Sequence, residues 1–412
     1  MQSQGSEISN NSIKCDVFVV GAGPAGMMAA ITSARAGKKV IVAEQKDIPG
    51  KKIYATGNGR CNFTNRFFDE KVFRGDDARF AYDAFSRFDN DDLIGFMHEL
   101  GVKSRDIGGY IYPYNEQAKT VAQALVYECQ RLGADIRTSE QVVDITQQFR
   151  SPEIIDKRFV ITTRKAVYTS ESVIIAVGGK ASPTHGSDGN LNKVIRKLGH
   201  NIILQDAALV PLKFEDASLS HLSGVRCKCK VKLFIDNDEF DSEEGEVIFN
   251  RDNISGIPVM QLSRYAVKAI RAGKAVRLEL DLVPDMSDSE LTGFIESSSD
   301  KRSEKHDALG LIIYDKVAEY ICERTDDTDE LIHFIKHFSI EINGDCGFNR
   351  AQVTAGGVDS NEVTEDMESK FVKGLFFAGE VLDVDGTCGG YNLQWAFTSG
   401  HIAGSAAAGF SS

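Results

Sequence analysis

The sequence of 412 residues predicts an α/β fold, in which a parallel sheet with helices is interrupted by an inserted β-rich plus helical domain. An apolar run over 16–20, a glycine-rich turn, a run of small residues and a second apolar run over 40–43 follow one another. This is the order strand, turn, helix, strand. Glycine-rich segments return only after Phe348. The length also exceeds the ~250–300 residues at which a single core stops growing, so we expect at least two packed units.

Changes in composition divide the chain into four expected segments. They are a disordered polar tail over 1–12, the first part of a nucleotide-binding domain over 13–190, an inserted substrate or cap domain over 191–346, and the second part of the nucleotide-binding domain over 347–412. Within the insertion, residues 200–264 are β-rich and residues 285–338 are partly helical. Residues 225–235 alternate apolar and basic side chains, which is typical of an antiparallel strand with one buried face.

The charge and composition of the chain argue against several classes of protein. Sixty acidic residues against 47 basic ones give a formal charge of -13, which repels phosphate backbones and anionic lipid, so we expect neither a nucleic-acid nor a membrane partner. No apolar run approaches the ~20 residues that span a bilayer, and the first twelve residues lack the apolar core of a signal peptide. We therefore expect a cytoplasmic protein. The eight cysteines contain no Cys-x-x-Cys pair, and we expect no metal site.

The turn Gly21-Ala22-Gly23-Pro24-Ala25-Gly26 has the glycine spacing of a Rossmann-like dinucleotide site. Gly21 suits a tight turn, Gly23 lets a pyrophosphate approach the backbone, and Gly26 lets the helix pack close to the sheet. Glu44 ends the second strand, where an acidic side chain can accept a hydrogen bond from a ribose hydroxyl. This favours FAD or NAD over NADP, and the alternative is an α/β turn without a ligand.

A long loop over 50–65 follows the second strand and includes Lys51, Lys52 and the run Thr56-Gly57-Asn58-Gly59-Arg60-Cys61-Asn62. Its backbone donors, small residues and basic groups suit a loop that wraps an anionic cofactor and hydrogen-bonds a polar ring. A solvated surface loop is the alternative interpretation.

Three motifs, taken together, identify a family. They are the Thr-Gly-Asn-Gly-Arg-Cys-Asn run at 56–62, Met367-Glu368-Ser369-Lys370, and Gly-Gly-Tyr-Asn-Leu-Gln-Trp-Ala at 389–396. The chain resembles the flavoproteins with two dinucleotide-binding domains, and more narrowly the family that includes bacterial aminoacetone oxidase and a bile-acid 3-dehydro-4,6-reductase. The resemblance extends from Cys15 to Ala407. It says little about the substrate.

The resemblance implies tightly bound FAD. The pyrophosphate would lie on the 21–26 turn, the adenosine ribose on Glu44, and the flavin beside the 56–62 loop. The backbone of Val143 would hold the adenine. The further implied cofactor-binding residues are Gln45, Lys51, Lys52, Ala176, Gly178, Gly179, Gly379, Glu380, Gly386, Gly390, Tyr391, Asn392 and Leu393. The family often has a longer glycine-rich stretch where this chain has 182–190, which weakens any transfer of substrate specificity.

Each candidate catalytic residue also has a structural interpretation that needs no catalytic role. Cys61 and Cys388 lie in cofactor loops and could be redox-active, although packing of a small residue against the ring explains each equally well. Tyr112 shares a strand face with Tyr110 and Tyr114 and could donate a proton, but the pattern favours a packed aromatic stripe. His185 follows the second glycine turn and could act as an acid or a base, or be an ordinary loop histidine.

These observations predict an FAD-dependent oxidoreductase that acts on a small organic molecule by hydride transfer through flavin N5. NADH or NADPH could serve as a transient donor, or oxygen as the acceptor, and the sequence leaves this choice and the oligomeric state open. The alternatives are a flavin-containing binding or regulatory protein without turnover, a tRNA-modifying type of flavoprotein, and a plain NAD dehydrogenase.

Overall fold

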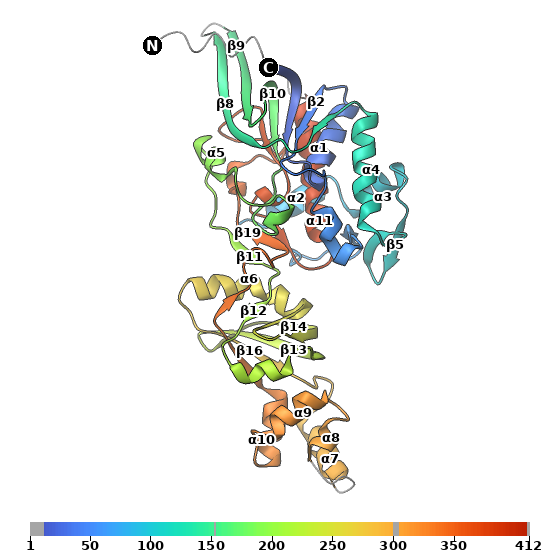
Figure 1. Cartoon of the computed structure of the whole chain (residues 1–412), viewed down its shortest axis with the longest axis vertical. Coiled ribbons are helices and arrows are strands. Elements are labelled where there is room, and N and C mark those ends of the chain that lie inside the picture. The colour runs from blue at the N-terminus through green and yellow to red at the C-terminus, as the bar shows by residue number, and fades with distance from the viewer. Residues whose placement is uncertain (1–11, 152–153, 300–304, 410–412) are drawn as a thin grey trace. The chain divides into compact units, whose positions relative to one another are not determined.

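The computed structural model describes residues 12–151, 154–299 and 305–409, and its contacts divide the chain into two compact units (Figure 1). The first unit comprises the chain up to residue 205 together with the chain from residue 353 onward, and the second comprises 206–352. The insertion therefore begins at 206 rather than at 191, because Ile203 donates its N–H to the carbonyl of Gly357 (2.7 Å) within the first unit. All of the expected tail except Ser12 lies outside the described residues.

A parallel sheet forms the centre of the first unit, with strands in the order β7-β2-β1-β10-β20. These strands are β1 (Ile13–Val20), β2 (Val40–Ala43), β7 (Asp135–Arg137), β10 (Val167–Ile175) and β20 (Leu375–Phe377). The first half of β10 pairs instead with an antiparallel hairpin of β8 (Val142–Ser151) and β9 (Ile154–Thr163). Continuous apolar residues in β1 and β2 are buried, as expected for parallel strands covered on both faces. This architecture confirms the predicted α/β fold with a Rossmann-like sheet.

Two helices of the first unit approach each other closely (Figure 1). α1 (Pro24–Arg35) follows β1, and α11 (Tyr391–Gly409) follows β20. A Cβ atom placed on Gly404 of α11 would lie 2.6 Å from the carbonyl oxygen of Ala29, so only glycine allows this separation. Gly400 approaches the carbonyl of Ala25 in the same way. The two helices thus pack backbone against backbone at the end of the sheet where the glycine turn lies.

The remaining elements of the first unit are short. Its other helices are α2 (Arg79–Phe85), α3 (Asn90–Glu99), α4 (Ala118–Arg131) and α5 (Asn192–Lys197), with 3-10 helices η2 (Ile53–Gly59), η3 (Pro183–His185), η5 (Ser360–Glu362) and η6 (Gly379–Val381). Its other strands are β3 (Thr64–Asn65), β4 (Phe73–Arg74), β5 (Ser104–Ile107), β6 (Tyr110–Pro113), β19 (Val353–Ala355) and β21 (Asp385–Gly386). Strands β3, β6 and β5 form a small antiparallel sheet, and β21 pairs with β4.

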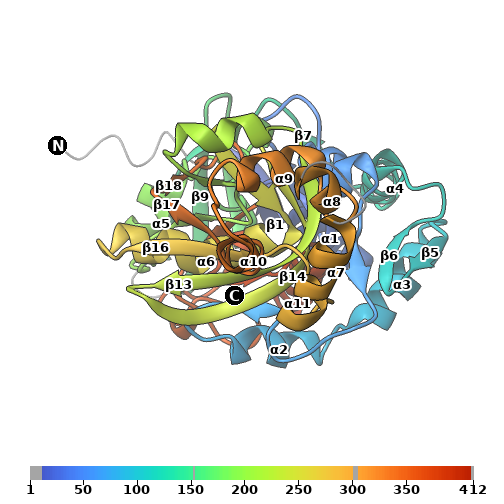
Figure 2. The same ribbon diagram turned by 90° about the horizontal axis from the view of Figure 1, so that it is seen from below.

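The second unit contains an antiparallel sheet in the order β17-β16-β13-β14-β15-β12-β18, in which β13 and β14 form a long curved pair (Figure 2). The strands of this unit are β11 (Asp206–Ala208), β12 (Leu212–Lys213), β13 (Arg226–Ile235), β14 (Asp238–Phe249), β15 (Asn253–Gly256), β16 (Val276–Asp281), β17 (Phe338–Ile342) and β18 (Gly344–Asp345). Its helices are η4 (Ala217–Leu222), α6 (Ile257–Arg271), α7 (Asp288–Ser299), α8 (Lys305–Leu309), α9 (Asp315–Cys322) and α10 (Thr328–Lys336).

The two parts of the insertion are less separate than the sequence suggested. The expected β-rich stretch over 200–264 contains the start of α6, whose apolar face is buried next to β14. Strands β16 and β17 belong to the same sheet although they lie outside that stretch. Helices α7 to α10 lie between residues 288 and 336. Among the described residues no helix is both long enough and apolar enough to cross a bilayer.

The close contact between α1 and α11 predicts a stability difference between two glycines of the same helix. Gly404→Ala should destabilise the first unit by about 1–3 kcal/mol, because the added methyl group overpacks the contact with Ala29. Gly409→Ala is the matched control, since nothing lies within 4 Å of its Cβ position. Urea unfolding followed by the fluorescence of Trp395, the single tryptophan, measures both variants. Equal unfolding midpoints for the two variants would contradict this account.

Candidate nucleotide-binding site

The glycine turn between β1 and α1 leaves open space at its centre. Gly21 has φ +100°, and a Cβ atom there would lie 2.5 Å from the carbonyl oxygen of Ala176. A Cβ atom on Gly26 would collide with the carbonyl of Gly21. A Cβ atom on Gly23, in contrast, would meet nothing within 4 Å. Gly21 and Gly26 therefore serve chain packing, while Gly23 leaves room for a ligand group close to the backbone.

The N-terminus of α1 faces the same space. Gly23 is the N-cap residue and provides no side-chain cap, and Pro24 occupies the first turn. The backbone N–H groups at the start of a helix lack intrahelical partners, and the helix dipole is positive there, so an uncapped first turn suits an anionic group. The loop at Gly379 packs against this turn, because a Cβ atom on Gly379 would lie 2.9 Å from the Cβ of Ala25.

Glu44 directly follows β2, with its carboxylate directed toward the glycine turn. One carboxylate oxygen accepts a hydrogen bond from the N–H of Ala22, and the other accepts one from the N–H of Lys46, both at 2.8 Å. Burial raises the pKa of this carboxyl group. Two backbone donors leave further lone pairs on the carboxylate, so it can still accept a ribose hydroxyl.

Gln45, the next residue, forms hydrogen bonds with the 182–190 segment. Its amide nitrogen donates to the carbonyl of Gly186 (2.6 Å), and its amide oxygen accepts from Asn190 (2.9 Å). This position was predicted to contact the cofactor. In the structure its side chain orders a neighbouring turn.

A polar network joins four distant segments beside the second glycine turn. Lys52 forms an ion pair with Glu380 (Nζ to Oε2, 2.6 Å), and Glu380 also accepts from the N–H of Thr354 (3.0 Å). The hydroxyl of Thr354 accepts from the N–H groups of Lys180 (2.8 Å) and Ala181 (3.0 Å). This network excludes any side chain at position 179: a Cβ atom there would come within 2.8 Å of Glu380 Oε1.

Gly178 and Ala176 lie on the same turn. Gly178 has φ +72°, and a Cβ atom on it would lie 2.6 Å from the hydroxyl of Ser187. The carbonyl of Ala176 faces Gly21, as described above. The turn after β10 is therefore built against the first glycine turn.

The 56–62 loop is held in an unusual conformation and contains an unpartnered acceptor. Asn58 and Cys61 both have positive φ, at 54° and 58°, as have Gly57 and Gly59. Such conformations are strained for residues other than glycine and cluster at ligand sites. Asn62 Oδ1 is buried and has no hydrogen-bond partner, and a Cβ atom on Gly390 would lie 2.9 Å from this oxygen.

The unpartnered oxygen provides a test of whether a flavin fits here. A buried acceptor without a donor costs about 1–3 kcal/mol. A flavin ring carries an N–H group that can satisfy such an acceptor. The open space at Gly23 and the uncapped start of α1 therefore suit the pyrophosphate of a flavin dinucleotide, and the Asn62 acceptor suits its flavin ring.

Helix α11 begins opposite this loop. The side-chain amide of Asn392 forms a pair of hydrogen bonds with the backbone of Gly386, both at 2.8 Å. The hydroxyl of Tyr391 donates to the carbonyl of Phe67 (2.7 Å), and burial raises its pKa to about 12. Both side chains are thus engaged by the protein itself. Leu393 is half-buried and has no polar side chain. Residues 391–393 can therefore offer a ligand chiefly their backbone N–H groups and the positive end of the helix dipole.

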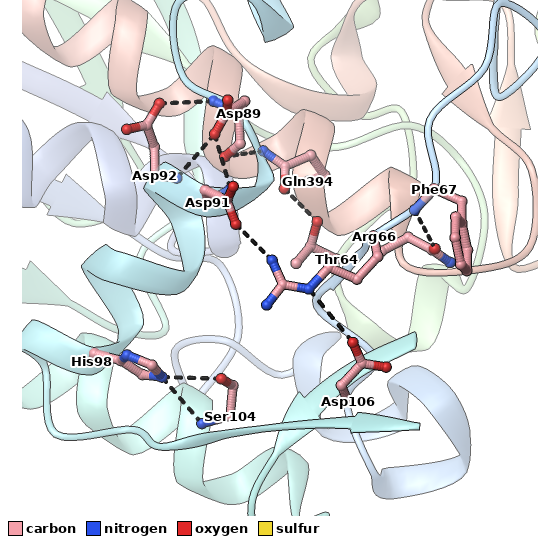
Figure 3. A network of polar contacts seen from close by, with 11 residues as sticks. Thr64, Arg66, Phe67, Asp89, Asp91, Asp92, His98, Ser104, Asp106 and Gln394 are labelled. Atoms are coloured by element: carbon pink, nitrogen blue, oxygen red, sulfur yellow. Dashed lines mark hydrogen bonds and ion pairs between the residues drawn. The ribbon is translucent and has the colours of Figure 1, made fainter. Parts of the chain in front are cut away.

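A second polar network connects α11 to the small sheet (Figure 3). Gln394 accepts from the hydroxyl of Thr64 (2.6 Å) and donates to the carbonyl of Asp89 (3.0 Å), the residue that caps α3. Arg66, two residues beyond Thr64, pairs with Asp91 (2.6 Å) and Asp106 (3.5 Å). This network holds the segment after the 56–62 loop in place.

The sequence analysis missed Gln394 and Thr354 as site residues. Both are buried polar side chains that organise the surrounding backbone. Gln394 lies within the 389–396 motif, and Thr354 directly precedes Ala355-Gly356-Gly357. For Thr354, a polar residue between Val353 and the small residues 355–357 was the available signal.

The two candidate cysteines, Cys61 and Cys388, differ in how deeply they are buried. Cys61 is fully buried, and burial raises the pKa of its thiol to about 12. Cys388 is half-buried, and neither of these two residues forms a disulfide. A buried thiol with a raised pKa is a poor nucleophile. The geometry therefore favours a packing role for Cys61.

The other candidates have different surroundings. Burial lowers the pKa of His185, and Lys51 and Lys52 lower it further, so this histidine is neutral near a basic cluster. Tyr112 is half-buried with the guanidinium of Arg60 over its ring (4.5 Å), and burial raises its pKa. Val143 is 45% exposed at the start of β8. Among the described residues, no three His, Cys, Asp or Glu side chains gather as a metal site.

The burial of Cys61 predicts its chemical reactivity. In the native holoprotein, iodoacetamide at about pH 8 should leave Cys61 unmodified while it alkylates the partly exposed Cys322, because a buried, protonated thiol does not react. Peptide mapping by mass spectrometry measures both sites, and urea-denatured protein is the control for full labelling. Fast labelling of Cys61 in the folded protein would revive the redox-active interpretation.

Comparison with known proteins places this site in a family. The family model described as "HI0933-like protein Rossmann domain" matches residues 15–406. The chain is 35% identical to a 3-dehydro-bile acid delta(4,6)-reductase of Clostridium scindens, over 95% of this chain and 98% of that protein. It is 30% identical to a ribosomal RNA dihydrouridine synthase of Haemophilus influenzae, over 93% of this chain and 96% of that protein.

Among solved structures, the 3-ketosteroid-delta4-(5alpha)-dehydrogenase of Rhodococcus jostii has a similar fold. The TM-score is 0.51 at 14% identity, with 98% of this chain and 99% of that chain covered. The match of the family model covers almost the whole chain and includes every segment of the site described above. The chain therefore belongs to the HI0933-like family, which confirms the family of flavoprotein oxidoreductases predicted from the sequence.

Proposed function

We propose that this protein is an FAD-dependent reductase that transfers a hydride to a carbon–carbon double bond conjugated to a carbonyl group in a small molecule. The observation that carries this proposal is the 35% identity, along nearly the whole chain, to a protein named as a reductase of 3-dehydro-bile acids. Residues 15–406 match one family model, so the similarity is not confined to the nucleotide-binding segments.

The two named relatives support the same reaction class although their substrates differ. A 3-dehydro steroid with a double bond at carbon 4 is an enone. The double bond of uridine that is saturated in dihydrouridine is also conjugated to a carbonyl. In both, a hydride adds to the carbon remote from the carbonyl and a proton completes the reduction. A shared scaffold with two such relatives favours this chemistry for the present chain.

We propose that the site described above holds FAD, with Gly23 and the first turn of α1 at the pyrophosphate, Glu44 at the adenosine ribose and Asn62 at the flavin ring. Bound FAD would supply two-electron hydride chemistry at its N5 atom. The other residues that the family resemblance implies as cofactor-binding would line the same FAD. The basic cluster near His185 suits the negative charge of a diphosphate.

The protein's own contribution is positioning and electrostatics. The start of α11 presents the positive end of a helix dipole, which stabilises negative charge that develops on a neighbouring ring. The Lys52–Glu380 ion pair fixes the loop at Gly379 against the second glycine turn. The Thr64–Gln394 hydrogen bond fixes the segment after the 56–62 loop to α11.

Reduction of a uridine in ribosomal RNA is the second candidate, and the 30% identity to the Haemophilus influenzae enzyme favours it. A formal charge of -13 opposes binding of a polyanion, whose affinity depends on neutralising phosphates. We therefore propose a small-molecule substrate.

The reaction can be tested without choosing an electron donor. Holoprotein reduced anaerobically by dithionite, with the excess removed, should regain its oxidised flavin absorbance when 4-androstene-3,17-dione is added, because the enone accepts the hydride. Mass spectrometry should find a product two mass units heavier. The matched control is the saturated ketone 5α-androstane-3,17-dione, which should leave the flavin reduced.

Two outcomes would contradict this proposal. If a uridine-containing ribosomal RNA fragment reoxidises the flavin and no member of an enone panel does, the RNA alternative is correct. If neither enones nor RNA reoxidises the flavin, the reductase proposal is wrong, and rapid reoxidation by oxygen would then favour an oxidase.

The role proposed for Glu44 predicts a loss of cofactor affinity. Glu44→Ala should raise the Kd for FAD about 10-fold or more, because a charged acceptor of ribose hydroxyl groups is lost. Glu44→Gln keeps one acceptor oxygen and should have a smaller effect. Calorimetric titration of FAD into the apoprotein measures both variants, and an unchanged Kd for Glu44→Ala would remove Glu44 from the site.

A further inference from the structure

Five side chains at and beside the small sheet of the first unit form a cluster that the flavin site does not explain. The arginine–tyrosine cluster consists of Arg60, Arg105, Tyr112, Tyr114 and Glu116. Strands β5 and β6 form a hairpin (Figure 2), in which Arg105 is directly opposite Tyr112. Arg60 comes from the 56–62 loop, so the cluster begins at the loop that we place beside the flavin.

The two arginines make the same contacts. The guanidinium carbon of Arg60 lies 4.5 Å from the ring centre of Tyr112, and that of Arg105 lies 4.3 Å from the ring centre of Tyr114. Both guanidinium groups also pair with Glu116, at 3.3 Å for Arg105. One carboxylate thus serves two cations, and the cluster retains an excess of positive charge.

Three features of the arginine–tyrosine cluster suggest that it can take up a further binding partner. Glu116 has φ +52°, a left-handed conformation that is strained for a residue with a side chain. Arg60 Nε is buried and has no hydrogen-bond partner. Tyr114 is 59% exposed, which leaves ring surface open to solvent. An unused guanidinium donor and an exposed aromatic ring, next to two cations that share one carboxylate, suit a ligand with an anionic group and a planar ring.

We propose that the arginine–tyrosine cluster binds the adenine nucleotide half of a nicotinamide dinucleotide that donates electrons to the flavin. A purine stacks on the open tyrosine ring, and a phosphate takes the place of Glu116 on the guanidinium groups. This inference rests on the proposed function, since a reductase requires a donor. The sequence contains one Gly-x-Gly-x-x-Gly turn, which we assign to FAD, so a second dinucleotide must bind elsewhere.

Glu116 gives this proposal a signature that a structural ion pair would lack. If the carboxylate competes with a ligand phosphate, its removal strengthens binding. If it merely orders the arginines, its removal weakens binding. Substitutions at Glu116 and Arg105 therefore act in opposite directions only when the cluster is an anion site.

The test is calorimetric titration of NADP⁺, and in parallel of NAD⁺, into oxidised holoprotein at low ionic strength. Arg105→Gln and Tyr114→Leu should each raise the Kd about fivefold, the loss expected for one stacked or charge-assisted contact. Glu116→Gln should lower the Kd about threefold, by analogy with the loss of one competing ion pair. Arg131→Gln is the matched control, because Arg131 also pairs with a carboxylate, that of Glu128, but lies on α4 outside the cluster and should leave the Kd unchanged.

The FAD content and the flavin spectrum of each variant report correct folding. The proposal is overturned if neither NADP⁺ nor NAD⁺ binds, if Arg105→Gln and Tyr114→Leu bind as the wild type does, or if Glu116→Gln weakens binding as Arg105→Gln does. It is also overturned if a single-stranded oligouridylate binds and displaces NADP⁺ from the same residues, which would make the cluster an RNA site. Reoxidation of the dithionite-reduced protein by an enone needs no nicotinamide donor. If the protein still shows this reoxidation but fails the binding test, this inference is wrong and the proposed function stands.

Discussion

The close approach of backbone segments around the start of α1 is the constraint on which the first unit depends. Gly21 lies against the turn after β10, Gly379 lies against Ala25, and Gly400 and Gly404 bring α11 onto α1. Each contact is too short for a Cβ atom, so a larger side chain at any of these positions would force segments apart. The result is a dense centre at one end of the parallel sheet. The uncapped turn of α1 and the loops that surround it are positioned by this packing.

The site combines groups that the protein satisfies with groups that it leaves unpaired. Glu44, Glu380 and Asn392 are engaged by backbone donors or ion pairs, which fixes their positions. Asn62 Oδ1 and Arg60 Nε, in contrast, are buried without partners. Buried polar atoms without partners are costly, so a ligand that satisfies them also stabilises the fold. The two unpaired atoms lie two residues apart in the strained 56–62 loop, which gives this loop contacts with more than one ligand in our proposals.

Local patterns were sufficient for the elements that lie close together in the sequence. The glycine spacing at 21–26 and the apolar runs on either side predict the β1-α1-β2 unit, because turn geometry, helix packing and strand burial are all set within thirty residues. The alternation over 225–235 predicts β13 for the same reason, since the side chains of a strand point to opposite faces in turn. The three family motifs were sufficient to predict the flavoprotein oxidoreductase family, although they do not specify a substrate.

The sequence by itself thus determined the fold class, the nucleotide-binding turn and the family. Only the tertiary structure decided that β10 pairs with β9 along its first half and with β20 at its end, and that the insertion begins at 206. It also decided the partners of Lys52, Gln394 and Glu116. Contacts such as Lys52 with Glu380 join residues 328 positions apart. Such pairs leave no periodic signal, because they arise only when separate elements pack against one another.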